Sequence, residues 1–206
     1  MQLFVAHQQR PGARPDRSSV DRFVCRAHRF RYASDCRVQR DAQGKPALLG
    51  SGSDPLERTC SISHTRDWLA CAFADQALVG IDIEVATTRD YVETGTWFFG
   101  AELGERLATT TPQQQRFIFY RAWTAYEALY KCGINRRRTL APLIGDSASV
   151  VRDNIALHWL VGPDELHACM AIVNGARIPQ QTVEVLCESA DSFSPDSRWR
   201  PAQLIA

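Results

Sequence analysis

The chain has 206 residues, of which 45% are hydrophobic and 23% are charged. This composition is typical of a globular protein that buries a substantial core. A formal net charge of +1 argues against a dedicated nucleic-acid binder, which carries a clear basic excess. No stretch approaches the ~18 consecutive apolar residues of a membrane span, and the apolar N-terminal run is too short for a signal peptide. We therefore expect a cytoplasmic protein with neither a membrane nor a nucleic-acid partner.

The spacing of the seven cysteines does not indicate a metal site. They form no C-x-x-C pair and none of the usual zinc spacings, and several lie inside apolar stretches. We expect them to act as small core residues in a reducing compartment. They are Cys25, Cys36, Cys60, Cys71, Cys132, Cys169 and Cys187.

The first part of the chain alternates strands with one helix. A short strand is expected over residues 3–6, and Ser18-Ser19 offers an N-cap for a helix that runs to about Tyr32. A turn over residues 41–46 follows. Three further strands are then predicted, at 59–63, 68–74 and 78–85.

The second part begins with helices and ends with strands. Residues 89–108 are predicted to form one or two helices. Pro112 favours the start of a long helix that runs to about Cys132 and stops at Gly133. Three more strands are expected near 155–160, 166–173 and 182–187.

One internal similarity indicates how these elements are organised. Leu69-Ala-Cys-Ala-Phe-Ala74 resembles His167-Ala-Cys-Met-Ala-Ile172, and each segment is followed by a second apolar strand and preceded by a helix. The match suggests two similar α/β halves, at about residues 1–86 and 87–206, that face each other.

Two carboxylates interrupt the apolar strand over 78–85. Asp82 and Glu84 are two residues apart, so they point to the same face of the strand. Carboxylates this close repel each other and raise each other's pKa unless a positive charge lies nearby. A hard divalent cation such as Mg²⁺ would satisfy them. A strand end open to water, or salt bridges to arginines, would do so too, and the strand alone leaves these possibilities open.

The long helix carries Trp123, Glu127 and Lys131 at intervals of four residues, which places them along one stripe. Such a pair of charges can be an ordinary surface ion pair worth a few tenths of a kcal/mol, roughly. Alternatively, Glu127 could be a third metal ligand and Lys131 a phosphate contact.

Two further segments carry groups that suit phosphate binding. Ser63 and His64 come at the end of the strand that precedes the carboxylate strand, and a hydroxyl and an imidazole there make good phosphate contacts. Gly44-Lys45-Pro46 presents a lysine on a rigid turn. It is not a Walker loop, because no helix follows the lysine.

Along the chain, four motifs follow one another: Gly44-Lys45-Pro46, Ser61-Ile-Ser-His64, Val79-Gly-Ile-Asp-Ile-Glu84 and Trp123-Thr-Ala-Tyr-Glu-Ala-Leu-Tyr-Lys131. The ordered set resembles the 4′-phosphopantetheinyl transferase superfamily, and most of all its monomeric, Sfp-like (surfactin-type) branch. The resemblance implies an α/β (α+β) fold, a pseudo-dimer of two similar halves in which each small antiparallel sheet packs with a long helix. The carboxylate strand would close the first half, and the long helix would belong to the second.

The resemblance also implies the chemistry and the site. Such an enzyme transfers the 4′-phosphopantetheine arm of coenzyme A to a serine of an acyl or peptidyl carrier protein and releases 3′,5′-ADP. Mg²⁺ would be held on the pyrophosphate of coenzyme A by Asp82, Glu84 and Glu127. Lys45, Ser63 and His64 would contact the nucleotide phosphates, and Lys131 the pyrophosphate. Glu127 would also help to deprotonate the incoming serine.

The chain departs from the family pattern at Tyr126, where members commonly carry a lysine directly before the helix glutamate. A non-catalytic homologue that binds carrier proteins or coenzyme A is therefore an alternative. A second alternative is a Mg²⁺-dependent phosphohydrolase or nuclease, which would use the Asp-x-Glu pair but leaves the Gly-Lys-Pro and Ser-His segments without roles.

Overall fold

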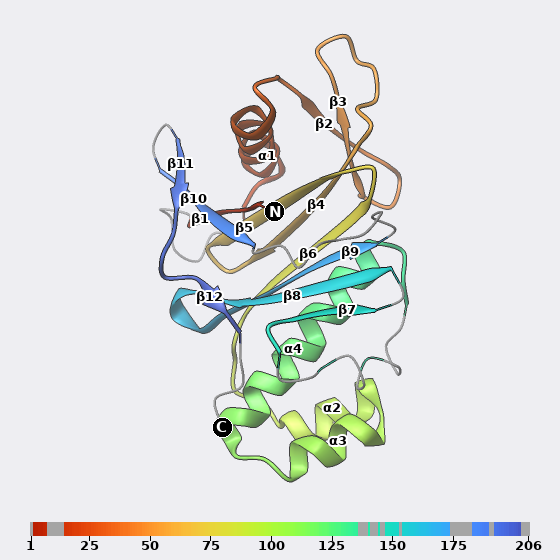
Figure 1. Ribbon diagram of the computed structural model, residues 1–206, viewed down its shortest axis with the longest axis vertical. Coiled ribbons are helices and arrows are strands. Elements are labelled where there is room, and N and C mark those ends of the chain that lie inside the picture. Colours follow the sequence, from red (N-terminus) through yellow and green to blue (C-terminus); the bar gives the residue numbers. More distant parts are fainter. Residues whose placement is uncertain are drawn as a thin grey trace.

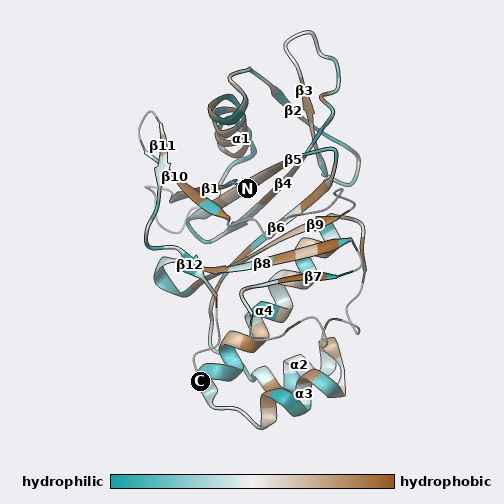
Figure 2. Cartoon of the chain, in the orientation of Figure 1, coloured by the Kyte–Doolittle hydropathy of each residue, from teal (hydrophilic) through white to brown (hydrophobic). Residues whose placement is uncertain are grey.

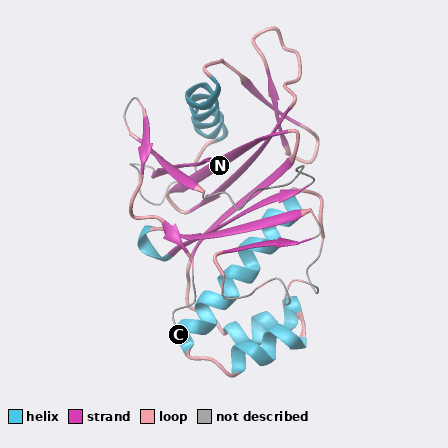
Figure 3. Ribbon diagram, viewed as in Figure 1, coloured by secondary structure: helices cyan, strands magenta, loops and turns pink. Residues whose placement is uncertain are grey.

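Two sheets pack against each other in the middle of the molecule, and helices cover their outer faces (Figures 1 and 3). The mixture of helices and mainly antiparallel strands is an α+β fold, as the sequence predicts. The computed structural model describes residues 2–7, 15–135, 140, 144, 147–152, 154–173, 183–189 and 192–202.

The first sheet has the strand order β11-β10-β1-β5-β4. Its central pair, β1 with β10, is parallel, and the other neighbours are antiparallel. Helix α1, Arg17–Tyr32, packs on its outer face, beside a separate hairpin formed by β2, Arg37–Arg40, and β3, Pro46–Leu49. The strands of this sheet are β1 (Gln2–His7), β4 (Arg58–Thr65), β5 (Trp68–Asp75), β10 (Glu184–Glu188) and β11 (Phe193–Pro195).

The second sheet has the order β12-β8-β9-β6, with β7 added beside β8, and all its pairs are antiparallel. Helix α4, Pro112–Lys131, packs on its outer face. Helices α2, Tyr91–Phe99, and α3, Ala101–Ala108, pack against α4. The strands are β6 (Leu78–Val85), β7 (Ser149–Arg152), β8 (Ile155–Val161), β9 (Leu166–Val173) and β12 (Arg200–Pro201), and a short 3₁₀ helix (Pro163–Glu165) joins β8 to β9.

Several strands are apolar on both faces because each face meets a different core (Figure 2). In β5, Ala70 and Ala72 face the core between the two sheets, whereas Cys71 and Phe73 face α1. Strand β9 divides in the same way between the inter-sheet core and the core under α4. The period-2 geometry of a strand thus turns a continuous apolar run into two buried surfaces.

The boundaries of α4 follow from its end signals. Thr111 and Gln114 form a reciprocal capping box and Pro112 takes the first helical position. Gly133 has φ +82°, a left-handed conformation that glycine adopts without strain. The predicted start and end of the long helix are therefore confirmed.

The predicted strands and helices of the first part are present, but one cap was wrong. Asp16, not Ser18-Ser19, caps α1, because its carboxylate accepts bonds from the Ser19 amide and from both serine hydroxyls. A carboxylate has the acceptors for several donors and also favours the positive end of a helix. The predicted turn over residues 41–46 joins β2 to β3, a hairpin that the sequence patterns did not indicate.

Strands from distant parts of the chain complete each sheet. Strand β6 pairs with β9 along eight residue pairs, and β10 pairs with β1. The two segments that resemble each other in sequence are β5 and β9, and each is an interior strand of its sheet. The division into halves at residue 86 stays a prediction. None of the described helices is long and apolar enough to cross a membrane.

Candidate active site

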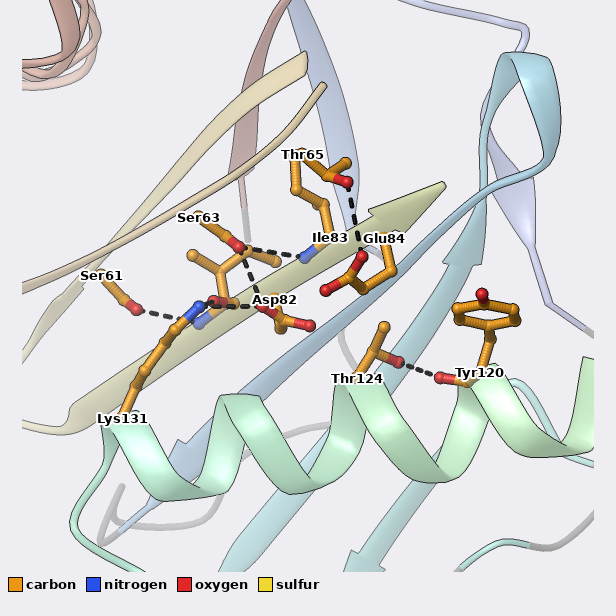
Figure 4. A network of polar contacts seen from close by, with 10 residues as sticks. Ser61, Ser63, Thr65, Asp82, Ile83, Glu84, Tyr120, Thr124 and Lys131 are labelled. Atoms are coloured by element: carbon orange, nitrogen blue, oxygen red, sulfur yellow. Dashed lines mark hydrogen bonds and ion pairs between the residues drawn. The ribbon is translucent and has the colours of Figure 1, made fainter. Parts of the chain in front are cut away.

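Strand β6 presents alternate residues to α4, and Gly80 sets how closely the two elements approach. A Cβ atom added to Gly80 would lie 1.8 Å from the carbonyl oxygen of Ala128 on α4, so only glycine fits. Asp82 and Glu84 lie two and four residues further along the same face. Figure 4 shows both carboxylates between β6 and the helix. The predicted pairing of the two side chains on one face is confirmed.

Asp82 is the most buried of these carboxylates, with 5% of the residue exposed. Its Oδ1 accepts hydrogen bonds from Ser63 Oγ at 2.9 Å and from Lys131 Nζ at 2.9 Å (Figure 4). Its Oδ2 is also buried but has no hydrogen-bond partner. Burial raises the pKa of the Asp82 carboxyl, and the charge of Lys131 opposes that rise. A half-satisfied carboxylate in this position is costly for the fold unless a ligand completes it.

Lys131 reaches from the last turn of α4 to β6. Its Nζ donates to the carbonyl of Ile81 at 2.8 Å as well as to Asp82. Strand β6 therefore holds the lysine in place from the opposite side of the site. Lys131 is thus not merely the partner of Glu127 in a surface ion pair on α4.

Besides burial, the charge of Asp82 raises the pKa values of both Glu84 and Glu127. Burial, followed by the Asp82 charge, raises the pKa of Glu84 to about 7, while bonds from Thr65 and Trp123 lower it. Burial and the same charge raise the pKa of Glu127, and Lys131 opposes this. The structure therefore gathers three acidic groups and one lysine into a common electrostatic field, with Asp82 at its centre.

Side-chain hydroxyls of β4 join the two sheets beside the acids. Ser61, Ser63 and Thr65 accept hydrogen bonds from the amides of Ile81, Ile83 and Val85, at 3.0, 3.3 and 3.5 Å. We call these six residues the hydroxyl seam. Ser63 also donates to Asp82, and Thr65 donates to Glu84 at 3.4 Å. Each of these two hydroxyls therefore holds a strand amide and a carboxylate at once.

The two remaining predicted phosphate contacts lie outside the seam. His64 lies between Ser63 and Thr65 on β4 and is exposed, so strand alternation directs it away from the acids. Lys45 is exposed in the β2–β3 turn, where its amide donates to Asp41 Oδ1 at 2.8 Å. Its charge acts on the Cys132 thiol, whose pKa burial raises to about 11. Lys45 thus lies near the end of α4 that carries Lys131.

The fit of a metal ion depends on these carboxylates. Within the described residues, no group of three or more His, Cys, Asp and Glu side chains is arranged as a metal site. The free Oδ2 of Asp82 and the raised pKa values of Glu84 and Glu127 are nevertheless what an oxygen-ligand site shows without its cation. The donor set suits Mg²⁺, and the ligand assignment stays a prediction.

Sequence reasoning missed the parts of the site that only pairing creates. The roles of Ser61 and Thr65 in the seam, the close approach at Gly80 and the bond from Trp123 to Glu84 were not anticipated. One signal was available: Ser-x-Ser-x-Thr over 61–65 has the same period as Gly-x-Asp-x-Glu over 80–84. Two polar alternations in adjacent apolar strands indicate that their polar faces meet.

Comparison with known proteins points to one enzyme superfamily. No family model matches the chain. It is 36% identical over 90 residues to the 4′-phosphopantetheinyl transferase AcpT of Salmonella typhimurium (strain LT2), covering 43% of this chain and 45% of that protein. It is 34% and 37% identical over 93 residues to the proteins of the same name from Escherichia coli K12 and O157:H7, covering 43% of this chain and 44% of each.

The aligned region thus spans less than half the length of the curated relatives. The matches support the resemblance to the phosphopantetheinyl transferase superfamily that the motifs indicate. They do not support the narrower assignment to the Sfp-like branch.

Proposed function

We propose that this protein is a 4′-phosphopantetheinyl transferase, an enzyme that moves the 4′-phosphopantetheine arm of coenzyme A onto a serine of an acyl or peptidyl carrier protein. The hydroxyl oxygen of that serine attacks the β-phosphorus of coenzyme A. The bond between this phosphorus and the bridging oxygen breaks, and 3′,5′-ADP leaves with the bridging oxygen.

One observation carries the proposal: a buried Asp82 whose Oδ2 lacks a partner is bonded to Lys131, and its charge contributes to the raised pKa values of Glu84 and Glu127. Phosphoryl-type transfer requires a concentrated positive field around the pyrophosphate and a group that takes a proton. The names of the partial matches, from proteins of the same superfamily, agree with this chemistry.

The protein's own residues supply most of these needs. Lys131 holds a positive charge beside Asp82 and would stabilise the departing phosphate. Glu127 lies one turn before Lys131 and has a raised pKa, so it accepts a proton more readily than an ordinary glutamate. It would take the proton of the carrier serine. Lys45 and His64 would bind the nucleotide phosphates, and Ser63 of the hydroxyl seam would be a further contact to these phosphates.

Asp82, Glu84 and Glu127 would hold Mg²⁺, which would neutralise charge on the pyrophosphate when bound. Calorimetric titration of the protein with Mg²⁺ alone gives a readout independent of transfer. We expect Asp82→Asn to abolish this binding and Glu84→Gln to weaken it less. Unchanged binding in Asp82→Asn would remove Asp82 from the ligand set.

The decisive test of activity is the mass of an apo-carrier protein after incubation with the enzyme, coenzyme A and Mg²⁺. The carrier should gain the mass of one phosphopantetheine group. Glu127→Gln should abolish this gain, because it removes a charge and a proton acceptor with little change of shape. Tyr126→Phe is the matched control on the neighbouring position. Its ring packs against Phe98 with centroids 5.1 Å apart, a contact that phenylalanine keeps, so most activity should remain.

A second test separates phosphate contacts from structural roles. Lys45→Ala and His64→Ala should weaken binding of coenzyme A more than binding of dephospho-coenzyme A, as measured by calorimetry. Equal losses for both ligands would contradict a contact with the 3′-phosphate. Tight binding of coenzyme A without any transfer to several carriers would instead support the non-catalytic homologue, the alternative that Tyr126 keeps open.

We further propose that the protein acts as a monomer and that it belongs to the Sfp-like branch, which the order of its motifs resembles. Sedimentation of the purified chain tests the first statement, and a carrier panel from fatty acid, polyketide and nonribosomal peptide synthesis tests the range of partners.

A further inference from the structure

Cys25 and Cys36 form a contact that the proposed transfer reaction does not use. Cys25 lies on α1, and Cys36 directly precedes β2, so the pair bridges two separate elements. Their Sγ atoms are 3.6 Å apart, and Cys25 Sγ also lies 3.1 Å from the carbonyl oxygen of Cys36. Both cysteines are free thiols. A disulfide bond of about 2.05 Å therefore needs the two sulfur atoms to approach by about 1.5 Å.

The two thiols differ in accessibility and in acidity. Cys36 is buried, with 8% exposed, whereas Cys25 is half-buried. The hydrogen bond from Cys36 lowers the pKa of the Cys25 thiol, and the same bond raises the pKa of Cys36. Because Cys25 is the more exposed of the two, it is the sulfur that a reagent reaches first, and Cys36 lies 3.6 Å away, where a resolving thiol must be.

Helix α1 lies beside the β2–β3 hairpin (Figure 1), and the two cysteines join these elements, because Cys25 is on α1 and Cys36 directly precedes β2. One helical turn before Cys25, Asp21 binds Arg40 of β2, with Oδ1 and Nη2 2.6 Å apart. The same hairpin ends in the turn that carries Lys45, whose amide is held by Asp41. A covalent bond at Cys36 would therefore restrict the movement of the segment that presents Lys45.

We propose that Cys25 and Cys36 are a reversible oxidation site, in which a small-molecule disulfide converts the two thiols into a disulfide bond that locks the β2–β3 hairpin to α1. The Cys25 thiolate attacks one sulfur of the reagent, forms a mixed disulfide and releases one small thiol. The Cys36 sulfur then gives up its proton, attacks Cys25 Sγ and displaces the second small thiol. Two protein thiols are oxidised, one reagent disulfide is reduced, and the two protons end on the two released thiols.

The test uses the full chain in glutathione buffers of increasing oxidised fraction, followed by acid quenching, alkylation and digestion with trypsin. Cleavage after the arginines of α1 separates the two cysteines into peptides 23–26 and 32–37. We expect these peptides to be joined by a disulfide in oxidised samples and to separate after reduction. Their absence as a joined species at every buffer ratio would overturn the proposal.

Three variants assign the steps. Cys36→Ser should stop at a stable glutathione adduct on Cys25, and Cys25→Ser should leave Cys36 unmodified. Cys187→Ser is the matched control, because Cys187 is also half-buried and its sulfur lies 3.9 Å from the carbonyl of Glu188. This control should yield the joined peptides at the same rate as the unaltered chain. Modification of Cys36 in the Cys25→Ser variant would overturn the order of the steps.

Hydrogen exchange measures the structural consequence. Oxidation should slow amide exchange in residues 37–49, the hairpin, relative to the reduced protein, and the Cys25→Ser variant should show no difference between the two buffers. Equal exchange in the oxidised and reduced chains would overturn the locking of the hairpin. Neither readout depends on coenzyme A or a carrier, so the result stands apart from the proposed transferase activity.

Discussion

The two edges of strand β6 are built in different ways. On one side, β6 pairs with β9 through a regular antiparallel ladder from Leu78 to Val85. On the other side, its amides at Ile81, Ile83 and Val85 bind the hydroxyls of the seam instead of backbone carbonyls. The ladder uses only groups that every residue has, whereas the seam depends on three particular side chains.

This difference explains where the acids lie. A backbone ladder leaves side chains free to be apolar, and β9 is buried along its whole length. A hydroxyl that accepts from an amide still has a proton to donate, so the seam can also hold Asp82 and Glu84. The seam thus provides both the junction between the sheets and the polar wall of the candidate site.

The largest effect is expected from Lys131→Met. Without the lysine, the buried Asp82 loses its charge partner, and the free energy of unfolding should fall by about 3 kcal/mol at pH 7.5. Urea denaturation followed by tryptophan fluorescence measures the loss. Adding Asp82→Asn to this variant should restore part of it, because no buried charge then lacks a partner. Wild-type stability of Lys131→Met would show that the ion pair does not hold α4 against β6.

Ser63→Ala should have the next largest effect on stability. It leaves the Ile83 amide and Asp82 Oδ1 each without one bond, so we expect a loss of about 2 kcal/mol. Ser61→Ala is the matched control in the same strand, since Ser61 accepts from Ile81 alone, and it should cost about 1 kcal/mol. Equal losses in the two variants would mean that the link to Asp82 adds nothing to the seam.

His167, on the strand β9 that pairs with β6, makes the stability of the protein depend on pH. It lies opposite Glu84 in the ladder and stacks on Tyr120, and burial lowers its pKa to about 4. Because the unfolded chain binds this proton more readily, the stability that His167 contributes is complete above about pH 6.5 and is lost as the pH falls toward 4. His167→Phe should remove this loss in denaturation curves taken between pH 4 and 7. If the variant loses as much stability between pH 7 and pH 4 as the unaltered protein, other groups cause the loss.

Glu84, which Thr65 of the hydroxyl seam contacts, makes the stability of the protein depend on pH in the opposite direction. We expect this effect to be the smallest of the four. Its pKa of about 7 lies above the ordinary value of 4.5, so the folded chain binds this proton more readily than the unfolded chain. The stability contributed by Glu84 is complete below about pH 4.5 and declines as the pH rises through 7. In EDTA, the free energy of unfolding of Glu84→Gln, measured relative to that of the unaltered protein, should be higher at pH 7.5 than at pH 5. The reverse ranking would contradict the raised pKa.

Much of the local structure could be predicted because its signals are local. The strands around Asp82, the start of α4 at Pro112 and its end before Gly133 follow from alternation, capping and glycine geometry. The shared face of Asp82 and Glu84 follows from the period of a strand alone. The motif order was enough to indicate a superfamily that the partial matches then supported.

The sequence by itself determined which residues carry charge and how far apart they lie on each element. Only the tertiary structure decided that β4 meets β6 through hydroxyls, that Lys131 binds Asp82, and that Cys25 touches Cys36. Each of these contacts joins separate elements. Which edges and faces meet depends on the burial of the whole apolar surface, a sum over many distant residues that no short motif contains.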